Sequence, residues 1–592
     1  MIHSAAARRA VKAGLLAGIV VGYLGAVGMI EKFNVRNLVG TALTLGRLLM
    51  VLPAFLAGYL AVRPRVGRGH IERPAPMAAV SLGGLAGAIA GGVTATEVSF
   101  VHALHPDSVR EIFVSVSPTL LSILQFGRSV PVGAGILMAG GAALGAAGAG
   151  MRLVATRYRR PLLTGLFATL AVGLLQLIIP PILRQLSLST TWLYSPITQG
   201  LTYRGAIIVF GVSAAISLSW QVGGGPVRRR IRQLPESGRK SMSLAGLAVL
   251  LGILAVFPIL VGSVLSQILG TVGIFLMMGL GLNIVVGYAG LLDLGYVAFF
   301  AAGAYLTALL TGAAVANPFG VTHPVLPFHL SFYAAVPVVV LAAAFIGVLI
   351  GGPVLRLRGD YLAIVTLGFG EIARVLVTSD WLQRFLGGAE GLQGIPPAPI
   401  GGVSFRDPQP FYYLVLTFCL IAVYVSWRLA GSRVGRAWVA MREDEQVAEA
   451  MGISTVRYKL LAFAMGAAVG CLSGGLFAVQ IGSLSPVSFD VFISITALAV
   501  IILGGLGSIP GVVVGALVLI GLPGFLDEFE EFRLLIYGAV LIGIMILRPQ
   551  GLIPNIRRTR ELHEEELEQD AWGKRAGDAS VQAPIAIGGG TD

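Results

Sequence analysis

Hydrophobic residues along this chain gather in long, almost uncharged runs, and short loops rich in Lys and Arg separate the runs. Each run has about 20 residues, the length that a helix needs to cross a bilayer. The runs do not alternate apolar and polar positions, as the strands of a membrane barrel would. We therefore predict an all-α, polytopic integral membrane protein with about 16 transmembrane helices, six of them N-terminal and ten C-terminal. The expected spans are 12–30, 38–62, 76–96, 131–151, 161–183, 203–221, 243–262, 264–287, 290–312, 332–354, 360–378, 410–428, 458–481, 491–506, 509–525 and 533–547.

The placement of Lys and Arg predicts the orientation of these helices. With the N-terminus inside and every segment crossing, about two thirds of the 42 basic residues fall on the inner side. Cytoplasmic loops of membrane proteins carry such an excess. The same rule favours two short spans over one long helix in 491–525, with a turn at 504–511. We expect a multi-pass protein of the cytoplasmic membrane, with both termini in the cytoplasm.

The composition agrees with a membrane protein and excludes several other classes. Charged residues are 12% of the chain and apolar residues 56%, whereas soluble proteins carry about 25% charged residues. This difference excludes a soluble globular enzyme and a disordered chain. The net charge of +13 needs no nucleic acid as a partner, because basic cytoplasmic loops explain it. The two cysteines lie inside apolar runs and are too few for a disulfide framework or a cysteine-based metal site.

One Gly/Pro-rich, basic segment divides the apolar runs into two groups. It covers residues 222–242, and we interpret it as a cytoplasmic linker. Before it lies an N-terminal membrane extension, 1–221, with about six helices. After it lies the second group of spans, in 243–555. Residues 556–592 are polar, and we expect them to form a disordered cytoplasmic tail.

Motifs for catalysis do not occur in the sequence. A phosphate-binding loop of the form G-x-x-x-x-G-K-[ST] is absent. The histidines are scattered, and no spacing typical of a metal site is present. We therefore predict that this chain is not an enzyme and that it holds no metal and no cofactor of its own.

Polar and charged residues within the spans are candidates for a translocation path or a gate, because each is costly in lipid. Glu371 and Arg374 are three residues apart on one helix face, so they can pair with each other and have a structural role. Asn283 can hydrogen-bond a neighbouring helix or contact a permeant. An unpaired acid would instead suit a proton-coupled carrier. The candidates are Asn283, Asp293, Thr366, Glu371 and Arg374.

Small residues recur at every fourth position in several spans. On a helix, this spacing forms a groove along which two backbones approach closely. We predict that these glycines pack helices together, although a role in lining a path stays open. The glycines given this role are Gly466, Gly470, Gly474, Gly504, Gly505 and Gly507.

The loop 431–463 carries the signals of a short, ordered helix. Glu443, Asp444 and Glu445 crowd its start, where carboxylates interact favourably with the helix dipole. Gly452 suits the end of the helix. Because a span lies on either side, such a helix can pass force from a soluble partner into the membrane.

Five stretches of sequence occur in order in the second half of the chain. With them, residues ~262–555 resemble the permease subunits of branched-chain amino acid ABC importers, specifically the M-type subunit. The outer loop LGGAEGLQGIP (386–396) departs from the Gly-Gly-Pro-x-Gly-like form that is usual in that family, and the N-terminal extension lacks the family's motifs. The five stretches are GLNIVVGYAGLLDLGYVAFFAAGAY (281–305), LRLRGDYLAIVTLGFGEIARVL (355–376), REDEQVAEAMGISTVRYKLLAF (442–463), VIILGGLGSIPGVVVGALVL (500–519) and RPQGL (548–552).

The resemblance implies a permease subunit that forms the substrate path for branched-chain or related amino acids. It implies two ABC ATPase subunits that bind ATP and Mg, a second permease subunit of the H type and an extracytoplasmic substrate-binding protein. It also makes 243–555 the permease domain and residues about 443–455 the coupling helix that docks on an ATPase subunit. The coupling residues are Glu443, Asp444, Glu445, Glu449, Ala450 and Gly452.

Two other functions stay open at this point. An ion-coupled secondary transporter of small organic solutes would work without an ATPase and would depend on Glu371 or Asp293. A non-transporting scaffold would be built around the N-terminal spans. Capture of an ATPase subunit distinguishes the importer from both.

Overall fold

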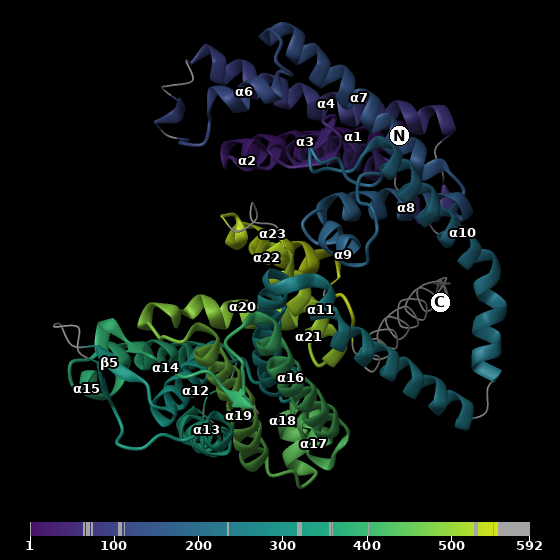
Figure 1. Ribbon diagram of the computed structural model, residues 1–592. Coiled ribbons are helices and arrows are strands. Elements are labelled where there is room, and N and C mark those ends of the chain that lie inside the picture. Colours follow the sequence, from purple (N-terminus) through teal and green to yellow (C-terminus); the bar gives the residue numbers. More distant parts are fainter. Residues whose placement is uncertain are drawn as a thin grey trace, which may run out of the picture. The chain divides into compact units, whose positions relative to one another are not determined.

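The computed structural model describes residues 2–62, 65–66, 71–72, 75–104, 109–111, 113–233, 236–316, 322–354, 357, 359–400, 402–525, 531–548 and 550–554. The chain forms two compact units, Met1–Val256 and Phe257–Asp592. Both are drawn in Figure 1, and each is described by itself below. The predicted tail 556–592 lies outside the described residues.

Helices occupy every segment that the sequence predicted as a span. By length and composition, 10 helices among the described residues are able to cross a membrane. Shorter apolar helices fill four further predicted segments. The all-α, polytopic architecture is therefore confirmed. The four shorter helices are Leu45–Ala61, Val297–Thr311, Ile509–Phe525 and Arg533–Ile546.

The remaining predicted spans differ from simple straight helices in two places. A single helical stretch, Leu244–Tyr288, is 45 residues long and covers the two spans predicted on either side of residue 263. Gly262, with a φ of 81°, interrupts its helical geometry. The span predicted at 161–183 is a pair of helices, Thr156–Leu174 and Ile179–Gln185, bent by 78°. A glycine in the left-handed region explains the first break, because other residues are strained there.

The N-terminal unit packs its main helices through glycines. α4 lies against α7, and both contact α3 (Figure 1). A Cβ on Gly87 would collide with the carbonyl oxygen of Gly141, and one on Gly58 with that of Gly145. The helices are therefore close enough that only glycine fits at these positions. The elements are α1 (Ile2–Ala26), α2 (Met29–Asn34), β1 (Asn37–Val39), β2 (Leu43–Thr44), α3 (Leu45–Ala61), β3 (Arg65–Val66), β4 (Ile71–Glu72), α4 (Pro76–Ala103), α6 (Pro118–Leu124), α7 (Val130–Leu153), α8 (Thr156–Leu174), α9 (Ile179–Gln185) and α10 (Tyr203–Gln233).

The boundary between the units lies in a long helix. α11 (Glu236–Leu282) begins before the boundary and continues into the C-terminal unit. The predicted linker 222–242 is covered by the end of α10 and the start of α11, so its described backbone is helical. The assignment of separate functions to the two parts of the chain stays a prediction.

The C-terminal unit is a larger group of helices with a small antiparallel sheet at one end. In this sheet, β5 (Ala314–Ala316) pairs with both β6 (Thr322–Pro324) and β7 (Leu392–Gln393). A second pair of strands is formed by β8 (Pro399–Ile400) and β9 (Val403–Ser404). The helices after α11 are η1 (Asn283–Tyr288), α12 (Val297–Thr311), α13 (Phe332–Val354), α14 (Asp360–Thr378), α15 (Gln383–Leu386), η2 (Gly388–Glu390), α16 (Pro408–Gly431), α17 (Arg433–Glu443), α18 (Glu445–Ala450), α19 (Thr455–Ile481), η3 (Pro486–Ser488), α20 (Val491–Gly504), α21 (Ile509–Ala516), η4 (Leu517–Gly521), α22 (Leu522–Phe525) and α23 (Arg533–Leu547).

α19 is the central helix of the C-terminal unit. It packs on α12 and α13, and most of its residues are buried. The hydroxyl of Tyr296 donates a hydrogen bond of 2.6 Å to the carbonyl of Gly466. A Cβ on Gly470 would lie 2.8 Å from the same hydroxyl, and one on Gly474 would collide with the carbonyl of Phe300. These glycines therefore lie where α12 approaches the backbone of α19.

Glycines also build the turn between α20 and α21. Gly505 and Gly507 have φ values of 122° and 77°, which other residues rarely adopt. A Cβ on Gly504 would collide with the carbonyl of Gly511. The end of α20 and the start of α21 thus lie in direct backbone contact, and this turn reappears in the site below.

Candidate functional site

The loop 431–463, which contains the predicted coupling helix at about 443–455, forms two short helices, α17 and α18, between α16 and α19. Asp444 separates them, because its Oδ1 accepts hydrogen bonds from the N–H groups of Gln446 and Val447 at 2.8 and 3.0 Å. A short acidic side chain in this position competes with helix continuation and starts a new helix. Glu443 is the last residue of α17, and Glu445 is the first of α18. The sequence analysis placed all three acidic residues at one helix start, whereas they flank a junction between two helices.

The base of this segment is anchored to α19. The ammonium group of Lys459 and Oε1 of Glu445 form an ion pair of 2.5 Å. The two side chains are 7% and 25% exposed. Nearby, Nε1 of the fully buried Trp438 donates to the carbonyl of Tyr458 at 2.8 Å. Because a buried ion pair holds its partners in one geometry, α17 and α18 are tied to the start of α19.

The outer face of α18 is exposed. Val447 is 58% and Met451 79% exposed, and both are apolar. Glu449 and Ala450 are also exposed. Gly452 has a φ of 86°, and a Cβ there would meet no atom within 4 Å. α18 is therefore held at its start by Glu445 and exposed on its other side.

Two hydrogen bonds connect the coupling segment to the interior of the unit. Nη1 of Arg442, at the end of α17, donates to the carbonyl of Gly287 at 2.5 Å. Gly287 belongs to η1, a π-helix that continues α11. In the same π-helix, Oδ1 of the fully buried Asn283 accepts from the N–H of Gly507 at 2.9 Å. The turn between α20 and α21 is therefore linked through η1 to the end of α17.

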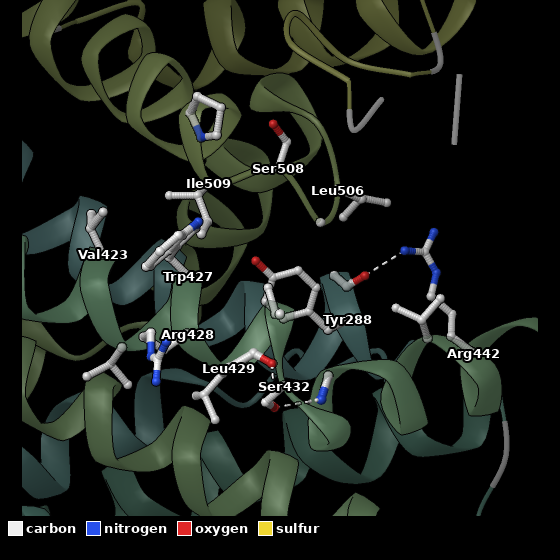
Figure 2. A pocket seen from close by; sticks show the side chains of 18 of the residues that line it. Tyr288, Val423, Trp427, Arg428, Leu429, Ser432, Arg442, Leu506, Ser508 and Ile509 are labelled. Carbon is white, nitrogen blue, oxygen red and sulfur yellow. Dashed lines mark hydrogen bonds between the residues drawn. The ribbon is translucent and has the colours of Figure 1, made fainter. Parts of the chain in front are cut away.

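A cavity of about 1250 Å³ lies beside these linked segments. Figure 2 shows Tyr288, Trp427 and Arg442 around it, with Leu506 and Ile509 of the turn on the other side. Most of its lining side chains are apolar, and Arg428, Ser432, Glu443 and Ser508 add polar groups.

Asp293 and Thr366 meet in the segment between η1 and α12. Oδ1 of Asp293 accepts from the N–H of Gly295 at 2.9 Å, and Oγ1 of Thr366 accepts from the N–H of Leu294 at 3.0 Å. Both side chains are almost completely buried. A Cβ on Gly295 would collide with the carbonyl of Thr366. The polar groups therefore bind an irregular backbone segment to α14, where lipid could not satisfy it.

Glu371 and Arg374 pair with each other on α14, as their spacing allows. Oε2 of Glu371 lies 2.9 Å from Nη2 of Arg374 and also accepts a bond of 3.0 Å from its Nε. The two side chains are 42% and 49% exposed. The structure does not bring this pair to the cavity beside η1, and a role for it in a translocation path stays a prediction.

Three anchoring residues were not among the sites expected from the sequence: Trp438, Arg442 and Lys459. Lys459 alone had a usable signal, because a lysine inside the first turns of an apolar helix needs a partner. The partner of Arg442 is 155 positions away, so no local pattern indicates it. Among the described residues, no group of three or more His, Cys, Asp or Glu is placed to hold a metal ion.

The fold and the site define a polytopic membrane protein in which an exposed, anchored helix is linked to buried polar groups between the spans. The family model described as branched-chain amino acid transport system / permease component matches residues 264–546. That region lies within the C-terminal unit.

Individual relatives agree with the family match. The chain is 39% identical over 334 residues to the high-affinity branched-chain amino acid transport system permease protein LivM of Escherichia coli (strain K12), which covers 52% of this chain and 75% of that protein. It is 26% identical over 330 residues to the probable branched-chain amino acid transport permease protein LivM of Methanocaldococcus jannaschii, covering 49% of this chain and 93% of that protein. Over 153 residues it is 31% identical to the high-affinity branched-chain amino acid transport system permease protein LivH of Escherichia coli (strain K12), covering 25% of this chain and 48% of that protein. No solved structure matches the chain.

The chain belongs to the family of branched-chain amino acid transport permeases. It is therefore a transporter subunit, and the M-type resemblance stated from the sequence is confirmed.

Proposed function

We propose that this chain is the M-type permease subunit of an ABC importer for branched-chain or related amino acids, and that α18 couples it to ATPase subunits on separate chains. The observation that carries the proposal is the geometry of α18. Its outer face, with Val447 and Met451, is exposed, while Glu445 at its start is held by the buried Lys459. A helix that is free on one face and anchored on the other suits the transfer of force from a soluble partner.

The proposal includes the partners that the sequence resemblance implied. A second permease subunit of the H type would complete the path, and the similarity to proteins named LivM and LivH supports such a pair. Two ATPase subunits would bind ATP and Mg, and an extracytoplasmic binding protein would deliver the amino acid. The excess of basic residues around α17 supports a cytoplasmic position for the coupling segment, and with it cytoplasmic termini in the cytoplasmic membrane.

The hydrogen bonds described above suggest how motion of α18 would reach the spans. Movement of α17 and α18 pulls on the carbonyl of Gly287 through Arg442. Because η1 also holds the turn at Gly507 through Asn283, the turn follows. A charged donor strengthens the first of these bonds relative to a neutral one. The two bonds thus form a path from the docking helix to the segments between the spans.

The cavity of about 1250 Å³ lies where this path ends. Its apolar lining suits an aliphatic side chain, and Ser508 adds a hydroxyl group to its wall. We infer that this cavity is the inner part of the amino-acid path and that it changes shape when α17 moves.

Docking can be tested by reversing the charge on the exposed face of α18. Glu449→Lys should abolish capture of the ATPase subunit by the tagged permease pair, because it places a new charge on the docking face. A matched control is Asp380→Lys, which makes the same change on an exposed residue after α14 and should leave capture unchanged. Capture is measured by affinity purification in detergent.

Reconstituted vesicles complete the test. The wild-type complex should accumulate leucine only with binding protein and ATP, and Glu449→Lys should reduce that uptake at least tenfold. An intact complex with Glu449→Lys would contradict the docking role of α18. Uptake by the permease alone, driven by an ion gradient, would favour the secondary-transporter alternative.

A further inference from the structure

A cavity of about 350 Å³ lies inside the N-terminal unit, outside the region matched by the family model. Helices α1, α3, α4 and α7 all contribute to its wall. Apart from Arg47 and Thr94, its lining consists of apolar residues and glycines, and Met50, Leu137 and Leu144 are among the largest. Its volume falls within the range of about 300–1,000 Å³ that is usual for small-molecule sites.

Two adjacent glycines of α7, Gly140 and Gly141, show that the cavity lies beside a tightly packed helix contact. Gly141 fits against Gly87, because a Cβ on Gly141 would collide with the carbonyl of Gly87. Gly140 also lines the cavity, yet a Cβ there would meet no atom within 4 Å. The helices are thus in close contact at Gly141, while the position beside it leaves room for a ligand.

Arg47 places a positive charge at one end of this apolar space. It lies in the first turn of α3, where its N–H donates to Oγ1 of Thr44 at 3.1 Å. Nη1 donates to the carbonyls of Thr41 and Ala42, both at 3.0 Å. A guanidinium has five N–H donors, and the Nε and Nη2 groups of Arg47 have no partner among the described residues. These donors are free to bind an anion.

The position of Arg47 matches that of a lipid headgroup. α3 is an apolar helix of 17 residues, and basic residues at the ends of such helices lie at the membrane interface. From Arg47, the cavity follows α3 to Ala54, seven residues or about 10 Å along the helix. The cavity therefore runs from the interface into the apolar layer.

The polar groups of the lining decide which class of ligand fits. A free amino acid would need an acceptor for its ammonium group, but no carboxylate lines the cavity among the described residues. The hydroxyl of Thr94 already donates to the carbonyl of Ala90 at 3.1 Å. A molecule with one anionic group and a long apolar part satisfies both Arg47 and the lining.

We propose that this cavity binds an acyl chain of an anionic membrane lipid, with the lipid phosphate on the guanidinium of Arg47. The bilayer around the unit supplies such molecules, and an arginine pairs well with phosphate oxygens. The site is independent of the coupling role of α18, so neither proposal rests on the other.

The test uses the full-length chain in detergent and native mass spectrometry with added phosphatidylglycerol or phosphatidylcholine of identical acyl chains. We expect the wild type to bind phosphatidylglycerol about fivefold more tightly, which is the usual effect of one basic residue on an anionic lipid. Arg47→Gln should reduce this preference to about one, and Arg47→Lys should retain part of it. Gly140→Leu should remove binding of both lipids at this site, because the new side chain fills the cavity.

Gly150→Leu is the matched control for the filling variant. Gly150 is also on α7 and also has open space at its Cβ, but it does not line the cavity, so lipid binding should stay at the wild-type level. Unchanged phosphatidylglycerol binding in Gly140→Leu would overturn the proposal, as would an unchanged preference in Arg47→Gln. Displacement of phosphatidylglycerol from the wild type by millimolar leucine would show that the cavity is an amino-acid site instead. If Gly140→Leu fails to fold, the wild-type preference and the two Arg47 variants still decide the question.

Discussion

The helices inside the N-terminal unit and those inside the C-terminal unit are held together in different ways. In the N-terminal unit, the main helices approach each other through glycines such as Gly87, whose neighbours leave no room for a Cβ. The C-terminal unit uses the same device at Gly474. Side-chain hydrogen bonds between distant segments occur in both units. The bond from Nη2 of Arg36 to the carbonyl of Leu174 in the N-terminal unit is only partly buried, whereas the bonds to Asn283 and Ser494 in the C-terminal unit are fully buried. Asn283, Thr366 and Ser494 each accept a hydrogen bond from a backbone N–H of another segment.

The difference distinguishes contacts that determine the distance between two helices from bonds that make two segments move together. Close glycine contacts determine how near two helices lie, and such contacts allow small sliding movements. A buried hydrogen bond or ion pair instead makes two segments move together, because breaking it leaves a polar group unsatisfied in an apolar environment. In the unit that matches the permease family, the links through Asn283 and Ser494 are fully buried.

The largest effect on stability is expected from Gly474, which determines how closely α12 and α19 approach each other in the C-terminal unit. Gly474→Leu should lower the free energy of unfolding by about 3 kcal/mol or more. The new side chain would collide with the backbone of α12 and force α12 and α19 apart. The measurement is thermal unfolding of the purified chain in detergent. Gly543→Leu on α23 is the control, because its Cβ meets no atom within 4 Å. Equal melting temperatures of the two variants would refute the close contact at α19.

The ion pair between Lys459 and Glu445 should give the next largest effect. Glu445→Gln leaves the buried ammonium of Lys459 without its ionic partner, and breaking a buried pair costs about 3 kcal/mol. We expect a lower melting temperature and ATP hydrolysis that no longer drives uptake. Glu449→Gln changes an exposed acid and should shift stability by less than about 0.5 kcal/mol. A stable, fully coupled Glu445→Gln variant would show that the pair does not anchor α18.

The smallest effect on stability and the most specific effect on coupling are expected from Arg442. Arg442→Gln should reduce leucine transported per ATP hydrolysed by about tenfold, because a charge-assisted hydrogen bond contributes about 1.5–3 kcal/mol. Arg436→Gln is a close control, since Arg436 donates to the carbonyl of Gly431 in its own segment at 3.3 Å. If both variants transport equally well, the long-range bond to η1 does not carry the motion.

Much of the architecture could be predicted because each helix that crosses a bilayer needs an apolar run of its own, which the sequence shows directly. Every span follows from an apolar run, and the end of α18 follows from Gly452, whose positive φ the sequence anticipated. Asp444 also behaves as a helix start, although its neighbour Glu443 ends the preceding helix. These features depend on residues a few positions apart.

The links between segments could not be predicted from the sequence in the same way. Asn283 and Gly507 are 224 positions apart, and Arg442 and Gly287 are 155 apart. Each contact requires the tertiary arrangement of several helices, which hydrophobic periodicity does not specify.

The π-helix Asn283–Tyr288 has a consequence for the segment that follows it. A π-turn holds one residue more than an α-turn. If the same residues wound as an ordinary α-turn, every residue after them would rotate by about 100° about the helix axis, and the segment containing Asp293 would turn away from α14. The position of Asp293 therefore depends on the form of this turn as well as on its own side chain.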